Sequence, residues 1–331
     1  MIAAVPVEFA DPSLTADIVD GLTAVEKVLT EAANAEEALL TEASRHLIEA
    51  GGKRFRATLV LLAAQFGDPR DGRIVSAAAA IELTHLATLF HDDVMDEASI
   101  RRGHESANSR WNNTIAILTG DFLFARASSI LADLGPEAIR IQAETFAQLV
   151  SGQVAETLGP RPGQDPLAHY LRVVEDKTAS LIATAGRFGA MFADAPDDVV
   201  SRICSACHAI GVAWQLSDDI LEVASESAES GKAPGTDLRE GVRSLPVLHA
   251  LASPAPGDER LRELLSRDGL TDESLHAEAL ELLRTHPAMD AARADLARWV
   301  AVAQAEIAGL PDVSARHAFE TFCGFVKDRT S

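Results

Sequence analysis

Apolar residues recur every three to four positions over long stretches of the chain, which is the period of helices with one buried face. The segment from Asp71 to Glu97 has no proline and no glycine after Gly72, and it predicts one long helix that ends near a group of aspartates. A second segment, from Asp197 to Glu226, has Gly211 as its only glycine. It predicts another long helix.

Short segments rich in glycine, proline and aspartate separate these apolar stretches and predict turns. They are residues 67–72, 134–137, 158–166, 193–198, 227–237 and 252–259. None of these segments is rich enough in Pro, Gly and Ser to be an interdomain linker, and the sequence shows no internal repeat. The pattern predicts an all-α fold, a bundle of long helices that forms one domain over residues 1–331.

The composition of the chain limits the kinds of ligand that it is expected to bind. The 331 residues carry a formal net charge of -21, which disfavours nucleic acid and anionic lipid as partners. An anionic ligand would need local cations or metal ions. Three cysteines are too few for a disulfide framework, and the N-terminus does not resemble a signal peptide. No stretch is expected to reach the length needed to span a bilayer. We therefore expect a cytoplasmic protein without a transmembrane segment.

Three aspartates stand at the end of the first long helix. Asp92 and Asp96 are four residues apart and share a helix face, and Asp93 is one step around. The simplest explanation is a solvated helix end. Two observations argue against a solvated helix end. The helix macrodipole disfavours anions at a helix C-terminus, and a similar group of carboxylates occurs a second time in the sequence.

The second cluster lies near the end of the other long helix. Asp218 and Asp219 are adjacent, and Glu222 follows one turn later. Two clusters of hard oxygen ligands indicate divalent cations, and magnesium suits them because it binds through a few carboxylates together with substrate phosphates. Diphosphate is then the natural ligand.

Basic residues stand beside glycine turns or acidic motifs, where they could hold such a ligand. They are Lys53, Arg54 and Arg56 in "GGKRFR", Arg101 and Arg102 in "RRG", Lys177 in "EDKT", and Lys232 in "SGKAPGTD". With the two acidic clusters they indicate two diphosphates in one cavity. One would be held through metal and the other by cations alone.

These motifs resemble those of the trans-prenyltransferase family, the polyprenyl diphosphate synthases, which condense isopentenyl diphosphate onto an allylic diphosphate. The resemblance rests on "GGKRFR", "THLATLFHDDVMDEASIRRG", "GDFLFARA", "KTASL" and "QLSDDILE…GKAPGTDLREG", in the family's order and spacing. It implies the isoprenoid synthase fold around a central active-site cavity, about three Mg²⁺ ions bound with the allylic diphosphate, and a homodimer.

The resemblance also implies a role for each matching position. The metal ligands correspond to Asp92, Asp93, Asp96, Asp218, Asp219 and Glu222, although the family usually has Asp at the last of these. The homoallylic diphosphate site corresponds to Lys53, Arg56, His85 and Arg102, and the allylic contacts to Arg101, Lys177, Thr178, Gln215 and Lys232. Arg101, Lys177 and Lys232 would be catalytic, because they neutralise the leaving diphosphate.

Two other functions use similar residues. A class I terpene cyclase also ionises allylic diphosphates, but Glu222 stands where its second motif has Ser or Thr. A noncatalytic subunit of a heteromeric synthase would place no demand on the metal ligands. Elongation is favoured because the cations of "GGKRFR" and "RRG" are useful only for a second diphosphate.

Product length is predicted from the residues one turn before Asp92. Ala87 and Thr88 are small, and Thr84, Ala80 and Ala77 lie further back on roughly the same face. An open path for the growing tail predicts a long-chain polyprenyl product, of the kind used for a quinone side chain. Geranylgeranyl diphosphate is the alternative.

Overall fold

The computed structural model describes residues 9–225 and 234–330. Its backbone contacts divide the chain into two compact units. The first comprises Met1–Ala147, Leu181–Cys207 and Glu306–Thr321, and the second comprises Gln148–Ser180, His208–Ala305 and Phe322–Ser331. The extent of the domain, residues 1–331, stays a prediction.

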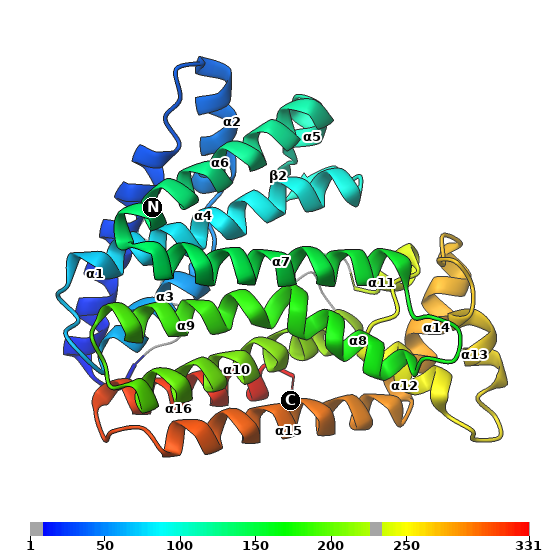
Figure 1. The fold of residues 1–331 in the computed structure, drawn as a ribbon. Coiled ribbons are helices and arrows are strands. Elements are labelled where there is room, and N and C mark those ends of the chain that lie inside the picture. Colours follow the sequence, from blue (N-terminus) through cyan, green and yellow to red (C-terminus); the bar gives the residue numbers. More distant parts are fainter. Residues whose placement is uncertain (1–8, 226–233, 331) are drawn as a thin grey trace. The chain divides into compact units, whose positions relative to one another are not determined.

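Helices make up nearly all regular structure of the described residues, so the all-α prediction is confirmed (Figure 1). The elements are α1 (Pro12–Ala32), α2 (Ala38–Glu49), α3 (Phe55–Ala64), α4 (Gly72–Met95), β1 (Ile100–Arg101), β2 (His104–Glu105), α5 (Ala107–Arg110), α6 (Asn113–Leu134), α7 (Pro136–Leu158), α8 (Pro166–Val174), the π-helical turn η1 (Glu175–Ala179), α9 (Ser180–Phe192), α10 (Asp197–Ala224), α11 (Thr236–Glu240), α12 (Leu245–Ala252), α13 (Glu259–Leu265), α14 (Glu273–Thr285), α15 (Ala288–Ala308) and α16 (Ser314–Asp328).

The first unit is built around α4, which runs beside α6 and also packs against α1 and α3 (Figure 1). Its sequence, rich in alanine, leucine and isoleucine, favours a buried helix. Asp71 caps the N-terminus by accepting a hydrogen bond from the backbone N–H of Arg73 at 2.8 Å. The helix ends at Met95, close to the predicted boundary at Glu97.

A tight hairpin follows α4. Strands β1 and β2 are antiparallel, with Ile100 opposite Glu105 and Arg101 opposite His104. The two turn residues, Arg102 and Gly103, have φ values of 53° and 76°. Left-handed backbone at both positions is typical of two-residue hairpins, and it brings the adjacent arginines back beside the end of α4.

Three described helices are long and apolar enough to cross a membrane by length and composition alone: α4, α6 and α10. The expectation that no stretch reaches this length is therefore wrong. Within their most apolar windows, 67% of α4 and 56% of α10 is buried inside the protein, but only 33% of α6. Helix α6 thus leaves much of its apolar surface uncovered.

Candidate functional site

In the first unit, α4 carries the first acidic cluster on its last turn. Asp93 is fully buried, Asp92 is half-buried, and Asp96 is exposed at the C-cap position. Within the described residues, no group of three or more His, Cys, Asp or Glu side chains converges as a metal cage. A cation bound through one or two carboxylates and substrate phosphates does not need one.

Asp93 and Arg101 form an ion pair, with Nε and Oδ1 at 2.5 Å. Burial raises the pKa of the Asp93 carboxyl, and the nearby Arg101 charge opposes this shift. The other oxygen of Asp93, Oδ2, is buried and accepts no hydrogen bond from the described residues. A buried carboxylate oxygen with this unused capacity fits a hard cation, which makes it the feature most consistent with a metal ion here.

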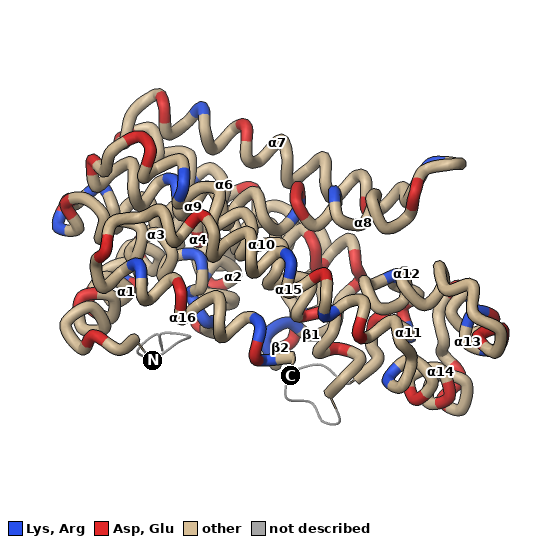
Figure 2. The backbone as a smooth tube through the Cα atoms, turned by 90° about the horizontal axis from the view of Figure 1, so that it is seen from below, with Lys and Arg blue, Asp and Glu red and all other residues tan. Residues whose placement is uncertain are grey.

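A second group of side chains in this unit is basic, and part of it lies on the β1–β2 hairpin (Figure 2). Arg102 donates through Nη1 to the backbone carbonyls of Leu47, at 2.9 Å, and Gly51. Burial lowers the pKa of Arg102 to about 10, and the charge of Arg54 adds to this effect. Burial also lowers the pKa of Arg56.

His85 lies among these arginines. Burial holds its pKa well below the usual 6.5, and the charges of Arg56 and Arg102 lower it further. The imidazole is therefore neutral at pH 7 and offers one donor and one acceptor. The structure thus brings Arg56, His85 and Arg102 into one positively charged region, while Lys53 is exposed in the loop before it.

Two residues that support this basic region received no role from the family resemblance, although Arg54 was among the candidate cations. Arg54 is buried, has a left-handed φ of 44°, pairs with Glu26 and lies 3.8 Å from Glu82. Glu82 is buried too, and it accepts a hydrogen bond from the backbone N–H of Ala57 at 3.0 Å. A glutamate within the apolar run "AAAAIELTHL" was the signal for this role, since buried carboxylates need partners.

In the second unit, α10 carries the other acidic cluster. Asp219 is buried and accepts three hydrogen bonds: from the Tyr170 hydroxyl at 2.5 Å, the Gln215 amide at 3.0 Å and the Leu245 backbone N–H at 2.9 Å. Burial raises the pKa of Asp219 to about 6 despite these donors. A metal ion at Asp219 would have to share its oxygens with these partners.

Asp218 and Glu222 share a face of α10, one turn apart. Asp218 forms an ion pair with Arg329, whose guanidinium carbon also stacks 4.4 Å from the ring centre of Trp214. Glu222 accepts a hydrogen bond from the backbone N–H of Asp237 at 2.9 Å. Arg329 was assigned no role from the sequence, and a metal ion bound at Asp218 would compete with it.

Two of the predicted allylic contacts, Lys177 and Thr178, lie on the π-helical turn η1, and a third, Gln215, lies on α10. Lys177 pairs with Glu156, with Nζ and Oε2 at 2.5 Å, and Thr178 donates to the Gln215 side chain at 3.3 Å. A side chain at Gly152 would place its Cβ 2.7 Å from the Lys177 backbone nitrogen. Gly152 therefore lets α7 approach the turn. Lys232 lies outside the described residues.

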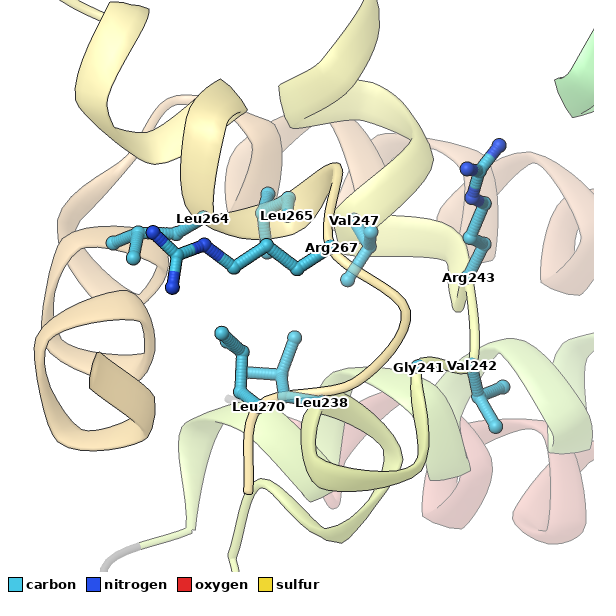
Figure 3. Close-up of a pocket in the computed structure, with 9 residues that line it drawn as sticks. All are labelled: Leu238, Gly241, Val242, Arg243, Val247, Leu264, Leu265, Arg267 and Leu270. Atoms are coloured by element: carbon cyan, nitrogen blue, oxygen red, sulfur yellow. The ribbon is translucent and has the colours of Figure 1, made fainter. Parts of the chain in front are cut away.

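A small pocket in the second unit is lined mainly by apolar side chains, unlike the two acidic clusters (Figure 3). Apolar side chains of Leu238, Val247, Leu264, Leu265 and Leu270 face one another across it, with Arg243 and Arg267 also on its lining. It contains none of the predicted site residues and no carboxylate. The chemistry predicted from the sequence therefore does not belong to this pocket.

Comparisons with known proteins agree with this chemistry. The family model described as polyprenyl synthetase matches residues 37–283. A nonaprenyl diphosphate synthase of Mycobacterium tuberculosis is 47% identical over 325 residues, which cover 98% of this chain and 96% of that protein.

Two solved structures share the fold over almost the whole chain. A geranylgeranyl pyrophosphate synthase of Corynebacterium glutamicum, complexed with calcium and isoprenyl diphosphate, has a TM-score of 0.89 and 42% identity, and the match covers 98% of this chain and 100% of that one. A decaprenyl diphosphate synthase of Rhodobacter capsulatus has a TM-score of 0.86 and 33% identity, with coverage of 96% and 99%. The prediction of the isoprenoid synthase fold is therefore confirmed.

Proposed function

The chain belongs to the polyprenyl synthetase family, and on that premise we propose that it adds isopentenyl diphosphate repeatedly to an allylic diphosphate to make a long-chain polyprenyl diphosphate. The prediction of a prenyl diphosphate synthase is confirmed by the family match. The observation that carries the proposal is the arrangement in the first unit. The Asp93 carboxylate pairs with Arg101 and also lies near Arg102, and Arg102 in turn belongs to the basic region with Arg56 and His85.

Magnesium is the proposed cation. Asp92, Asp93 and Asp96 would hold it in one unit, and Asp218, Asp219 and Glu222 in the other, with about three ions in all. Support comes from the buried Oδ2 of Asp93 and from the Corynebacterium glutamicum structure, which contains calcium and isoprenyl diphosphate. Bound Mg²⁺ would neutralise the developing charge of the leaving diphosphate.

The basic residues would form two groups, one for each diphosphate. Arg101, Lys177 and Lys232 would bind the allylic diphosphate and stabilise its charge as the carbon–oxygen bond breaks, with Thr178 and Gln215 as neutral contacts. Arg101 and Lys177 each pair with a carboxylate of the chain, so a diphosphate must draw them from Asp93 and Glu156. Isopentenyl diphosphate would be bound by Lys53, Arg56, His85 and Arg102. Its double bond attacks the allylic carbon, and the cation that results loses a proton to the departed diphosphate, which completes the addition.

Product analysis tests this function. The purified chain is incubated with Mg²⁺, labelled isopentenyl diphosphate and dimethylallyl, geranyl or farnesyl diphosphate, and the extracted prenols are separated by length. We expect label in a polyprenyl series that extends to six or more units. Consumption of allylic substrate without incorporation of label would show a cyclase instead, and no turnover of the chain alone would favour a subunit of a heteromeric synthase.

The product-length prediction concerns Ala87, which is buried on α4, and the half-buried Thr88, which donates to the His85 carbonyl at 2.8 Å. Ala87→Phe should shorten the products to about two units while the rate of the first addition stays similar, because a ring about 7.5 Å behind Asp92 blocks the tail and not the diphosphate. Chromatography of the extracted prenols measures this. Ala87→Ser, which stays small, should leave the lengths unchanged, and unchanged lengths in folded, active Ala87→Phe would mean that the tail grows elsewhere.

The relatives support two product classes. The nonaprenyl synthase at 47% identity and the decaprenyl synthase structure favour the long chain. The geranylgeranyl synthase structure at 42% identity keeps geranylgeranyl diphosphate as the second candidate. The length distribution of the unmodified chain separates the two.

We propose a homodimer as the assembly, with the uncovered face of α6 in its interface. Ile117 and Leu118 on α6 and Ile139 on α7 are large apolar side chains with 42%, 53% and 45% of their surface exposed. Large exposed apolar side chains on a helix whose apolar window is only 33% buried are consistent with an interaction surface. Sedimentation of the purified chain should give about 70 kDa, twice 35.2 kDa. A 35 kDa species that associates only with a second protein would support a heteromer.

The location also remains a proposal. The acidic composition and the small number of cysteines, three in 331 residues, are consistent with a cytoplasmic protein. Fractionation of cells that express the chain tests this, since recovery with the membrane pellet after a salt wash would contradict it.

A further inference from the structure

Four polar side chains interrupt the apolar interior of the first unit, on helices α4, α7 and α9. Thr84, Gln142, Thr145 and Thr184 are all at most 6% exposed. Gln142 donates through Nε2 to the Thr84 hydroxyl at 2.6 Å, and the hydroxyls of Thr145 and Thr184 are 2.7 Å apart. Two hydrogen-bonded pairs thus link α7 to the helices on either side of it.

The Thr84 hydroxyl accepts a hydrogen bond from Gln142 and donates one to the Ala80 carbonyl at 2.8 Å. This holds the Gln142 amide against α4. The side-chain oxygen of Gln142, in contrast, is buried and accepts no hydrogen bond from the described residues. A buried amide with one unsatisfied oxygen is costly, so its position is less firmly fixed than that of a fully bonded group.

The pair lies on the line that a growing tail would follow. Thr84, Thr88 and Asp92 are spaced by four residues, so they share one face of α4. Eight residues of helix place Thr84 about 12 Å behind Asp92. An extended carbon chain advances by about 1.1 to 1.2 Å per bond, so each prenyl unit of four chain bonds needs about 4.5 Å. Only about three units fit before the pair.

We propose that the Gln142 side chain, hydrogen-bonded to Thr84, is a gate that determines how many prenyl units the product receives. The inference rests on the proposed elongation activity. While the gate is closed, a tail of about three units meets a hydrogen-bonded amide and not the small side chains expected from the sequence. A longer tail must break the Gln142–Thr84 hydrogen bond and displace the amide, after which it meets the small buried side chains of Ala80 and Ala77.

The experiment compares product lengths in Gln142→Ala and the unmodified chain. With isopentenyl diphosphate limiting, the readout is the ratio of products longer than four units to those of four units or fewer. Loss of one buried hydrogen bond and its side chain should raise this ratio about fivefold, with the rate of the first addition unchanged. Gln148→Ala, which removes an exposed glutamine from the same helix, should leave the ratio unchanged.

Thr84→Val provides a second variant in case Gln142→Ala does not fold. It keeps the size of residue 84 but removes the acceptor of the Gln142 amide, so the ratio should rise again. An unchanged ratio in a folded, active variant, even with a lower melting temperature, would show that the pair only stabilises helix packing and would overturn the inference. Failure of the unmodified chain to incorporate isopentenyl diphosphate would instead overturn the proposed function itself.

Discussion

Asp92→Ala should lower kcat by about 10²- to 10³-fold, the loss typical when one stabilising contact to a developing charge is removed. Asp92 is half-buried on the last turn of α4, and the change opens no cavity in the apolar core. The helix should therefore fold as before. Steady-state turnover at saturating Mg²⁺ and circular dichroism on the same preparations measure the two effects separately.

Asp218→Ala gives the same test in the second unit, with one difference. Removal of this carboxylate also releases Arg329, so some loss of thermal stability is expected in addition to the loss of turnover. Glu36→Ala, which removes an exposed carboxylate from the segment before α2, serves as the control and should retain full activity. Near-normal kcat in either aspartate variant would refute the metal assignment.

The long helices were predictable because their signals are local. An apolar period, an aspartate at the N-terminus and an absence of internal proline identify α4 to within about two residues at each end, and similar signals identify α10. The acidic clusters follow directly from helix geometry. The ion pair between Arg101 and Asp93 was not predicted, because it depends on the hairpin that turns the chain back after α4.

Long-range partners were not predictable. Asp219 owes its buried hydrogen bonds to Tyr170 and to the backbone of Leu245, which lie 49 and 26 residues away. Arg54 and Arg56 stand on either side of a single phenylalanine, and nothing in that pattern distinguishes their roles. Only the fold shows that Arg54 pairs with Glu26 and that Arg56 lies beside His85.

Glu222 illustrates how a departure from the family pattern can have a local explanation. Its Oε1 reaches the backbone N–H of Asp237 in the first turn of the short helix α11. A first-turn N–H has no partner within its own helix, and a longer carboxylate can satisfy it. The extra methylene of Glu over Asp is consistent with this reach, so Glu222 would support the second cluster as well as supply an oxygen.

Arg102→Ala should raise the KM for isopentenyl diphosphate by about 10- to 100-fold, with a much smaller change in the KM of the allylic substrate. A charge-assisted hydrogen bond contributes about 1.5 to 3 kcal/mol, which corresponds to this range. The two arginines are assigned to different substrates because their neighbours differ. Arg102 lies in the basic region with Arg56 and His85, next to Arg54. Arg101 instead pairs with Asp93 in the first acidic cluster. Initial rates with each substrate varied in turn measure both constants.

Arg102 also bonds the carbonyls of Leu47 and Gly51, so its removal loosens the loop that carries Lys53. Lys53→Ala separates the two effects, because this exposed side chain can be removed without disturbing the buried contacts of Arg102. It should raise the same KM by about tenfold at an unchanged melting temperature. Arg70→Ala, an exposed arginine in the turn before α4, is the matched control. If the allylic KM rose most in both Lys53→Ala and Arg102→Ala, the assignment of this basic region to isopentenyl diphosphate would be wrong, and the region would instead hold the diphosphate that leaves.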